Sequence, residues 1–317
     1  MLAPIDQYYR YIDTRRVFAQ SMSTTQILCT FINWIGLIFP DEKYFTQEMF
    51  DVWCQKRDTE AWNTFVNRIG HLKGFVKYLA DLGYDEYFLP CYSKRKEHPF
   101  YTPISEAEIM NFITASDEIS NFELAKSENT NNANQKIQRI IKALILPVSS
   151  RFLYASGVRP TEIRLLERNS IDLNTGIIKI SASETKGYRE RMIAVSEEMR
   201  LLFMDYDCKM NEYVPNRRVF FSKANGENYS DWWWRRVFRE CWDRYNQGTE
   251  VVAYNMRHNY VIENIAKLDG TESDKHMLAL SASLGHSSLN RTMYYAHMTP
   301  RLASALERAD PDFLKEV

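Results

Sequence analysis

The sequence predicts a mainly α protein with a small antiparallel β-sheet, divided into two domains. Apolar residues recur at three- and four-residue steps through much of the first 92 residues and again beyond residue 105, which is the period of a buried helix face. Short β-branched segments occur close together between residues 171 and 195 and predict a few strands. A basic segment with two prolines separates the helical regions and predicts a linker at residues 93–104.

The composition is that of an ordinary globular protein. Its 317 residues are 45% hydrophobic and 26% charged, enough for two domains with sizeable cores. The net charge of -1 does not by itself predict a nucleic-acid partner, although clustered charge matters more than the sum. The five cysteines are not at metal-binding spacings, and the longest apolar stretch, Phe31 to Phe39, is too short to span a bilayer. We therefore expect a cytoplasmic protein without a membrane segment or a metal site.

The first domain, residues 1–92, should be all helical. Residues 1–20 are either an arm that becomes ordered on a partner or a terminus that packs locally. Three helices should follow, beginning near residues 24, 46 and 58, and the last should stop at Gly83. Arg68 and Lys77 lie off the apolar stripe of the third helix, where they either touch DNA phosphates or belong to a solvated face.

The second domain, residues 105–317, should begin with a helix that Ser105 and Glu108 cap reciprocally. Residues 127–135 are too polar to pack and predict a mobile loop. A buried helix should follow, with a kink at Pro147.

A further helix should start at Pro160, which places Arg159 at its N-terminal edge. A positive side chain gains nothing from the helix dipole there, so Arg159 suggests a functional site. The alternative is a structural pair with Glu162.

Strands are predicted at Ile171–Leu173, Ile177–Ser181 and Met192–Val195, with a hairpin turn at Lys186–Gly187. A helix near residues 197–207 and another capped by Ser230 should follow. The second of these contains three consecutive tryptophans, which cannot all face inward because neighbours on a helix are about 100° apart.

Two segments near the C-terminal end carry residues suited to phosphate chemistry. Arg257 and His258 are adjacent near a predicted helix start, and His286 precedes Tyr295 by nine residues. An arginine can hold a phosphate bidentately, a histidine can donate to it, and a tyrosine hydroxyl can attack it.

The order of these motifs resembles the tyrosine recombinase/integrase family over roughly the C-terminal two-thirds of the chain. Ser156–Leu166 is similar to the first arginine box of the family, with Arg159 and its acidic companion Glu162. Glu184–Val195 is similar to its β-hairpin lysine segment, with Lys186. The remaining matches are Arg257, His286 and Tyr295. One position departs from the pattern, because Tyr254 stands where the family usually has histidine.

The resemblance implies a two-domain DNA clamp, in which residues 1–92 form a core-binding domain and residues 105–317 a catalytic domain with a C-terminal tail helix. It implies double-stranded DNA as partner, a tetramer on two DNA sites and, as an option, accessory recombinases and a tail that docks on the neighbouring protomer. It places the enzyme on DNA in a bacterial or phage-infected cell. Basic side chains that would then contact DNA are Arg68, Lys77, Lys94, Arg95 and Lys96.

The chemistry implied by the resemblance is DNA cleavage through a covalent phosphotyrosine, without metal, nucleotide or other cofactor. Arg159 and Arg257 would neutralise the phosphate, Lys186 would protonate the leaving oxygen, and His286 would bond the phosphate or the nucleophile. Tyr254 can donate a hydrogen bond but cannot shuttle protons near neutral pH, so either little acid–base help is needed there or His258 supplies it.

Tyr294 is a rival nucleophile, although Tyr295 fits the family's pattern of a small residue and then histidine after the tyrosine. Two other functions stay open, namely a DNA-binding accessory relative with weakened chemistry and a relaxation activity like that of type IB topoisomerases.

Overall fold

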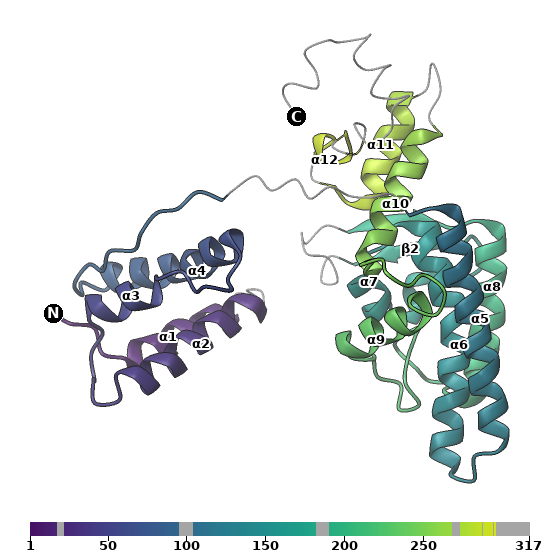
Figure 1. The fold of residues 1–317 in the computed structure, drawn as a ribbon, viewed down its shortest axis with the longest axis horizontal. Coiled ribbons are helices and arrows are strands. Elements are labelled where there is room, and N and C mark those ends of the chain that lie inside the picture. Colours follow the sequence, from purple (N-terminus) through teal and green to yellow (C-terminus); the bar gives the residue numbers. More distant parts are fainter. Residues whose placement is uncertain are drawn as a thin grey trace. The chain divides into compact units, whose positions relative to one another are not determined.

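The computed structural model describes residues 1–17, 22–94, 104–181, 190–267, 273–286, 288–293 and 295. These residues form a mostly helical protein with a three-stranded antiparallel sheet, which confirms the predicted fold class. The chain divides into two compact units, Met1–Phe100 and Tyr101–Val317 (Figure 1). Among the described helices, none is long and apolar enough to cross a bilayer.

Unit 1 is built from helices around an aromatic core. They are α1 (Asp6–Val17), α2 (Met22–Ile38), α3 (Gln47–Trp53) and α4 (Trp62–Asp81). Phe31 on α2 packs against Phe50 and Trp53 of α3, with ring centroids 5.6 and 5.2 Å apart. α4 begins at Trp62, later than predicted, and Gly83 follows its end with the positive φ of 79° that favours glycine.

The N-terminal segment belongs to this core. Tyr8 and Tyr11 are buried on α1 and pack against Phe75 of α4, with ring centroids 5.2 and 5.3 Å apart. Of the two readings of residues 1–20, local packing is therefore correct for residues 6–17.

Arg68 does not lie on a solvated face, and its prediction as a DNA contact is wrong. The residue is buried on α4, and its Nε and Nη2 each donate to a carboxylate oxygen of Glu60 at 2.8 Å. The guanidinium also donates to the backbone carbonyls of Trp53 and Gln55. Since a buried charge must be paired, Arg68 joins α4 to the end of α3. Lys77 and Lys94 are exposed.

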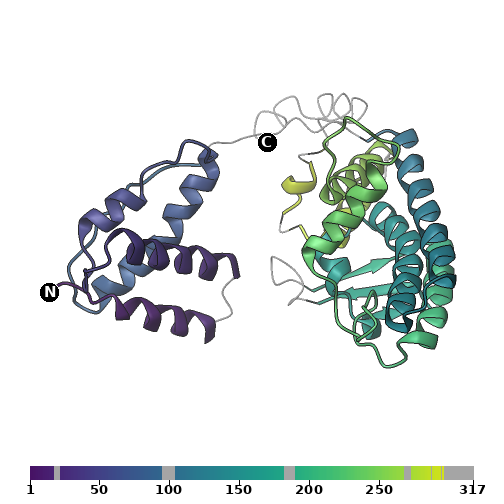
Figure 2. The ribbon, with the colours of Figure 1, turned by 60° about the horizontal axis from the view of Figure 1, so that its bottom comes forward.

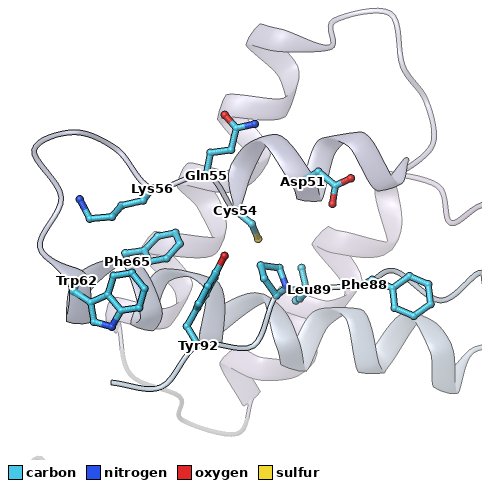
Figure 3. A pocket seen from close by; sticks show the side chains of 10 residues that line it. Asp51, Cys54, Gln55, Lys56, Trp62, Phe65, Phe88, Leu89 and Tyr92 are labelled. Carbon is cyan, nitrogen blue, oxygen red and sulfur yellow. The ribbon is translucent and has the colours of Figure 1, made fainter. Parts of the chain in front are cut away.

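Unit 1 also has a pocket of about 640 Å³ (Figure 3). Its walls come from the end of α3, the start of α4 and the segment at 88–92. Trp62 Nε1 donates to the Ser93 carbonyl at 3.0 Å, which holds this segment against α4.

Unit 2 begins with two long helices, α5 (Glu106–Glu128) and α6 (Ala133–Ser156), which lie side by side (Figure 1). The predicted capping box is confirmed, because Ser105 and Glu108 each accept from the backbone N–H of the other. The mobile loop predicted at 127–135 is wrong, since only residues 129–132 lie outside helix. Asn132 caps α6 by accepting from the Gln135 N–H, so these polar residues form solvated helix ends.

Helix α6 continues through Pro147, which has no N–H to donate to the Ala143 carbonyl one turn earlier. The Ser120 hydroxyl of α5 donates to that carbonyl instead, at 2.7 Å. A neighbouring helix therefore replaces the hydrogen bond that proline removes.

The sheet consists of β1 (Ile171–Asp172), β2 (Ile177–Ile180) and β3 (Arg191–Ala194), in that order. The three predicted strands are confirmed: the first two end one residue earlier than predicted, and the third begins and ends one residue earlier. The predicted turn at Lys186–Gly187 lies outside the described residues. Ile178 pairs with Ile193, and both are buried in a core shared with α5, α6 and α8. The ribbon in Figure 2 shows the strands beside the long helices of unit 2. Side chains alternate between the two faces of a strand, so Arg191, two positions before Ile193, lies on the same buried face.

The remaining elements of unit 2 are α7 (Pro160–Leu165), the 3₁₀ turn Arg168–Ser170, α8 (Glu197–Tyr213), α9 (Asp231–Trp242), α10 (Ala253–Ala266), α11 (Ser273–Leu284) and α12 (Asn290–Met293). The start of α7 at Pro160 and the Ser230 cap of α9 are confirmed. The tryptophans of α9 separate as expected, with Trp232 66% exposed and Trp234 9% exposed.

Candidate active site

The predicted catalytic residues that the structure describes lie on helices of unit 2 or directly beside them. Arg159 is the N-cap of α7, His286 follows α11, and Tyr295 follows α12. Tyr254, Arg257 and His258 are on α10. Lys186, Arg95, Lys96, Tyr294 and the tail at 301–317 lie outside the described residues.

Glu162 is a fully buried carboxylate held between two arginines. It accepts from Arg159 Nη1 at 2.7 Å and from the Arg159 backbone N–H at 2.7 Å. It also accepts from Arg191 Nη1 at 3.0 Å and Nη2 at 2.6 Å. Burial alone would raise the pKa of Glu162, but the hydrogen bonds and charges of the two arginines outweigh it and lower the pKa. The carboxylate therefore stays ionised and fixes the Arg159 side chain, which is 20% exposed.

Arg191 is a residue of the site that sequence reasoning missed. Besides binding Glu162, its Nε donates to the Ser283 carbonyl at the end of α11, at 2.7 Å. A Cβ on Gly285 would lie 3.0 Å from the Arg191 Cδ, so the backbone turn before His286 packs closely against this side chain. The one available signal was its position two residues before Ile193 on a strand with one buried face.

Arg257 joins three segments that are distant in the sequence. Its Nη1 donates to the Gly157 carbonyl at 2.7 Å and its Nη2 to the Leu284 carbonyl at 2.6 Å. Gly157 ends α6 with φ of 60°, and a Cβ there would lie 2.4 Å from the Tyr260 ring. Only glycine suits this position, because the backbone is left-handed and α10 packs directly against it.

The guanidinium of Arg257 is buried in a field of net positive charge. Burial lowers its pKa, and the charge of Arg159 lowers it further, while Tyr254 and Glu162 act in the opposite direction. Arg191 is a second positive neighbour of Arg257. The three arginines oppose one carboxylate, so this cluster carries two positive charges in excess.

Tyr295 is hydrogen-bonded to His258, the residue that follows Arg257 on α10. The Tyr295 hydroxyl lies 2.6 Å from His258 Nδ1, and the tyrosine is 8% exposed. Its ring packs in an apolar cluster with side chains of α10 and α11 of the same chain. Burial lowers the pKa of His258, and the charge of Arg257 lowers it further, so the imidazole is neutral at neutral pH. The Tyr254 ring packs edge-on against the imidazole, with centroids 4.9 Å apart.

His286 is tied to the segment that carries the tyrosine. Its Nδ1 lies 2.7 Å from the hydroxyl oxygen of Thr292, a buried residue of α12 that sequence reasoning missed. The Tyr295 backbone N–H donates to the Thr292 carbonyl at 3.1 Å. The histidine and the tyrosine are thus positioned by the same short helix.

The described residues of unit 1 supply none of these side chains. The pocket in Figure 3 is lined by residues of unit 1 alone. The exposed Lys77 and Lys94 also belong to unit 1. Throughout the described ranges, no group of three or more histidines, cysteines, aspartates or glutamates is arranged to hold a metal ion.

Solved structures share this fold. The Tn1549 transposon integrase in complex with transposon right end DNA matches with a TM-score of 0.61 and 17% identity, covering 97% of this chain and 99% of that one. The XerH site-specific recombinase bound to palindromic difH substrate matches with a TM-score of 0.57 and 16% identity, covering 91% of this chain and 78% of that one.

Relatives in sequence point the same way. A probable integrase/recombinase of Methanocaldococcus jannaschii is 27% identical over 199 residues, which is 59% of this chain and 56% of that protein. The tyrosine recombinase XerA of Thermococcus kodakarensis is 26% identical over 190 residues, 55% of this chain and 61% of that protein. The chain thus matches little more than half the length of these relatives. The phage integrase family model matches residues 124–301, more than half of the chain, and the protein therefore belongs to the phage integrase family.

Proposed function

We propose that this protein is a site-specific DNA recombinase that cleaves and rejoins strands through a covalent 3′-phosphotyrosine. The observation that carries the proposal is the excess of two positive charges around Arg159 and Arg257, close to the His258 and Tyr295 pair. Like charges held together are costly unless an anion binds between them. A phosphodiester carries one negative charge and gains more in the transition state, so it is a suitable ligand.

In the proposed reaction the Tyr295 oxygen attacks the phosphorus and the bond to the 5′-oxygen breaks. Arg159 and Arg257 stabilise the charge on the non-bridging oxygens, and His286 donates a hydrogen bond to the phosphate. Lys186 protonates the leaving 5′-oxygen, because an amine with a pKa of about 10.4 holds a proton at neutral pH. The phosphotyrosine conserves the energy of the broken bond, so a second 5′-hydroxyl can reseal the strand without metal or nucleotide.

The partner in this proposal is double-stranded DNA, to which unit 1 and unit 2 both bind. Lys77, Lys94, Arg95 and Lys96 would contact the phosphates, and four protomers would act on two DNA sites, with the tail at 301–317 docking in trans. The solved relatives described above as bound to DNA support the choice of partner. We place the activity in integration, excision or transposition of a mobile element, on DNA in the cytoplasm, with accessory recombinases as an option.

The proposal is tested by trapping the covalent intermediate. A pool of duplex oligonucleotides with a randomised core and a nick is incubated with the protein, and strands that remain attached in SDS are recovered and sequenced. A nick lets the short cleaved fragment diffuse away, so the adduct accumulates. Tyr295→Phe should abolish the adduct and preserve DNA binding, whereas Tyr213→Phe on an exposed surface should change neither.

Each other outcome of the trap contradicts a part of the proposal. Binding without any adduct would make the protein an accessory DNA-binding relative. Relaxation of supercoiled plasmids of arbitrary sequence would indicate a topoisomerase. An adduct that persists in Tyr295→Phe and disappears in Tyr294→Phe would move the nucleophile to the neighbouring tyrosine.

A further inference from the structure

We propose that His258 is a catalytic residue of this protein, which takes the proton of the Tyr295 hydroxyl as the tyrosine attacks DNA. The inference rests on the proposed function and deepens it. It assigns the acid–base role to the residue after the second arginine, one helical turn beyond Tyr254.

His258 lies within hydrogen-bonding distance of the reacting atom, the Tyr295 oxygen. Its Nδ1 lies 2.6 Å from the Tyr295 oxygen, within the range of a short hydrogen bond to a hydroxyl. The Tyr295 ring is held by packing, since it is 8% exposed and lies in the apolar cluster of α10 and α11, and the His258 ring packs against Tyr254. A base positioned in this way needs no rearrangement to receive the proton.

The surroundings of His258 also keep its imidazole able to accept a proton. Burial and the neighbouring Arg257 charge lower the pKa of His258, so it is neutral at neutral pH. A neutral imidazole has one nitrogen that accepts, and the tautomer protonated on Nε2 leaves Nδ1 as the acceptor for the phenol.

Tyr254 cannot supply this function. A phenol hydroxyl already carries a hydrogen, so it can donate a hydrogen bond but is a poor acceptor of a second proton. Tyr254 is 42% exposed, and its ring packs edge-on against the imidazole of His258. Since residues four apart lie on one helix face, Tyr254 is placed to support His258 rather than to replace it.

The proton balance of the step is complete. The Tyr295 O–H bond breaks, its proton moves to His258 Nδ1, and the tyrosine oxygen forms the bond to phosphorus. The bond from phosphorus to the 5′-oxygen breaks, and that oxygen takes the proton that the proposed reaction assigns to Lys186. In rejoining, a 5′-hydroxyl attacks phosphorus and gives its proton back to the Lys186 amine, while the tyrosine oxygen departs and recovers its proton from the imidazolium. The Arg257 charge beside the imidazolium favours that return.

The test varies the base and the nucleophile together, using a nicked duplex selected in the trap above. His258→Asn keeps an amide near the Nδ1 position for hydrogen bonding but cannot take up a proton. Tyr295 is replaced by a fluorinated tyrosine, whose phenol ionises at lower pH and needs less help. Single-turnover adduct formation is measured for the four combinations, and thermal melting verifies that each protein is folded.

We expect His258→Asn to slow adduct formation by about 10²-fold with ordinary tyrosine. With fluorotyrosine the loss should shrink to less than about 10-fold, because the phenol now gives up its proton more readily. A loss of equal size with both nucleophiles would overturn the proposal and leave His258 a packing role. A faster reaction would also overturn it, because His258 would then restrain the tyrosine. If the unaltered protein forms no adduct in the trap, the proposed function itself fails.

Discussion

Neutralising Glu162 by substitution with glutamine should destabilise unit 2 severely. The carboxylate accepts four hydrogen bonds, two from Arg159 and two from Arg191. Glutamine keeps one carbonyl oxygen and directs an NH₂ group at the remaining donors. At least two of the four bonds are therefore lost, and bonds to a charged group are worth about 1.5–3 kcal/mol each. The side chain of Arg191, only 4% exposed, is left without its counter-ion.

We expect a loss of about 3–5 kcal/mol in the free energy of unfolding, which matches the usual cost of breaking a buried pair. For a domain of this size the loss corresponds to a melting temperature lower by about 6–20 °C. Scanning calorimetry measures the shift, and hydrogen exchange of peptides from α7 and β3 assigns it to unit 2. The control is Glu197→Gln, which removes a carboxylate that is 64% exposed and bonds Arg200, and should leave the transition unchanged.

The effect should depend on pH in a defined direction. Because the folded state lowers the pKa of Glu162, its contribution is complete above the pKa of the unfolded chain, about 4.3. The contribution is lost as pH falls through the lower pKa of the folded state. The difference in free energy of unfolding between the unaltered protein and Glu162→Gln should therefore be constant from neutral pH to about 5 and shrink in stronger acid. A melting temperature like that of Glu197→Gln at neutral pH would refute the electrostatic account of Glu162.

Three more predictions follow from the same contacts. Gly157→Ala should lower the melting temperature of unit 2 and slow adduct formation, because its Cβ would lie 2.4 Å from Tyr260; unchanged melting would show that α10 can shift freely. A mixture of the Arg257→Ala and Tyr295→Phe proteins should yield no adduct with the nicked duplex, because Tyr295 packs on helices of its own chain. Restored cleavage would mean that the tyrosine of one protomer acts at the arginines of another. Arg68→Ala should destabilise unit 1 in calorimetry, because buried Glu60 loses its partner; weaker DNA binding at unchanged stability would argue for a phosphate contact instead.

The parts of the fold that sequence predicted well depend on neighbours along the chain. The Ser105 and Glu108 cap and the helix start at Pro160 each depend on residues at most three positions apart. The pair of Arg159 with Glu162, which was the alternative to a functional role for Arg159, spans the same distance. The apolar periods of the helices and the alternation in the strands have equally short range. Local chemistry therefore fixed the element types and the order of the candidate site residues.

The contacts that sequence analysis missed involve partners far along the chain. Arg191 reaches Glu162 across 29 residues, and Arg257 reaches the Gly157 carbonyl across 100. Neither separation leaves a pattern in the sequence. Arg68 was misplaced for a similar reason, since its carbonyl partners lie in a separate element.

The mobile loop predicted at 127–135 failed for another reason. Polarity shows that a segment stays in water, but it does not show that the segment leaves the helix.

The positions of the two carbonyls that accept hydrogen bonds from Arg257 have a consequence for synthesis of the protein. One belongs to residue 157 and the other to residue 284, so the guanidinium cannot be fixed until both segments have left the ribosome and folded together. The tyrosine follows only 11 residues after the second carbonyl. A nascent chain therefore cannot hold the Arg257 guanidinium in this position until the segment around residue 284 has been synthesised.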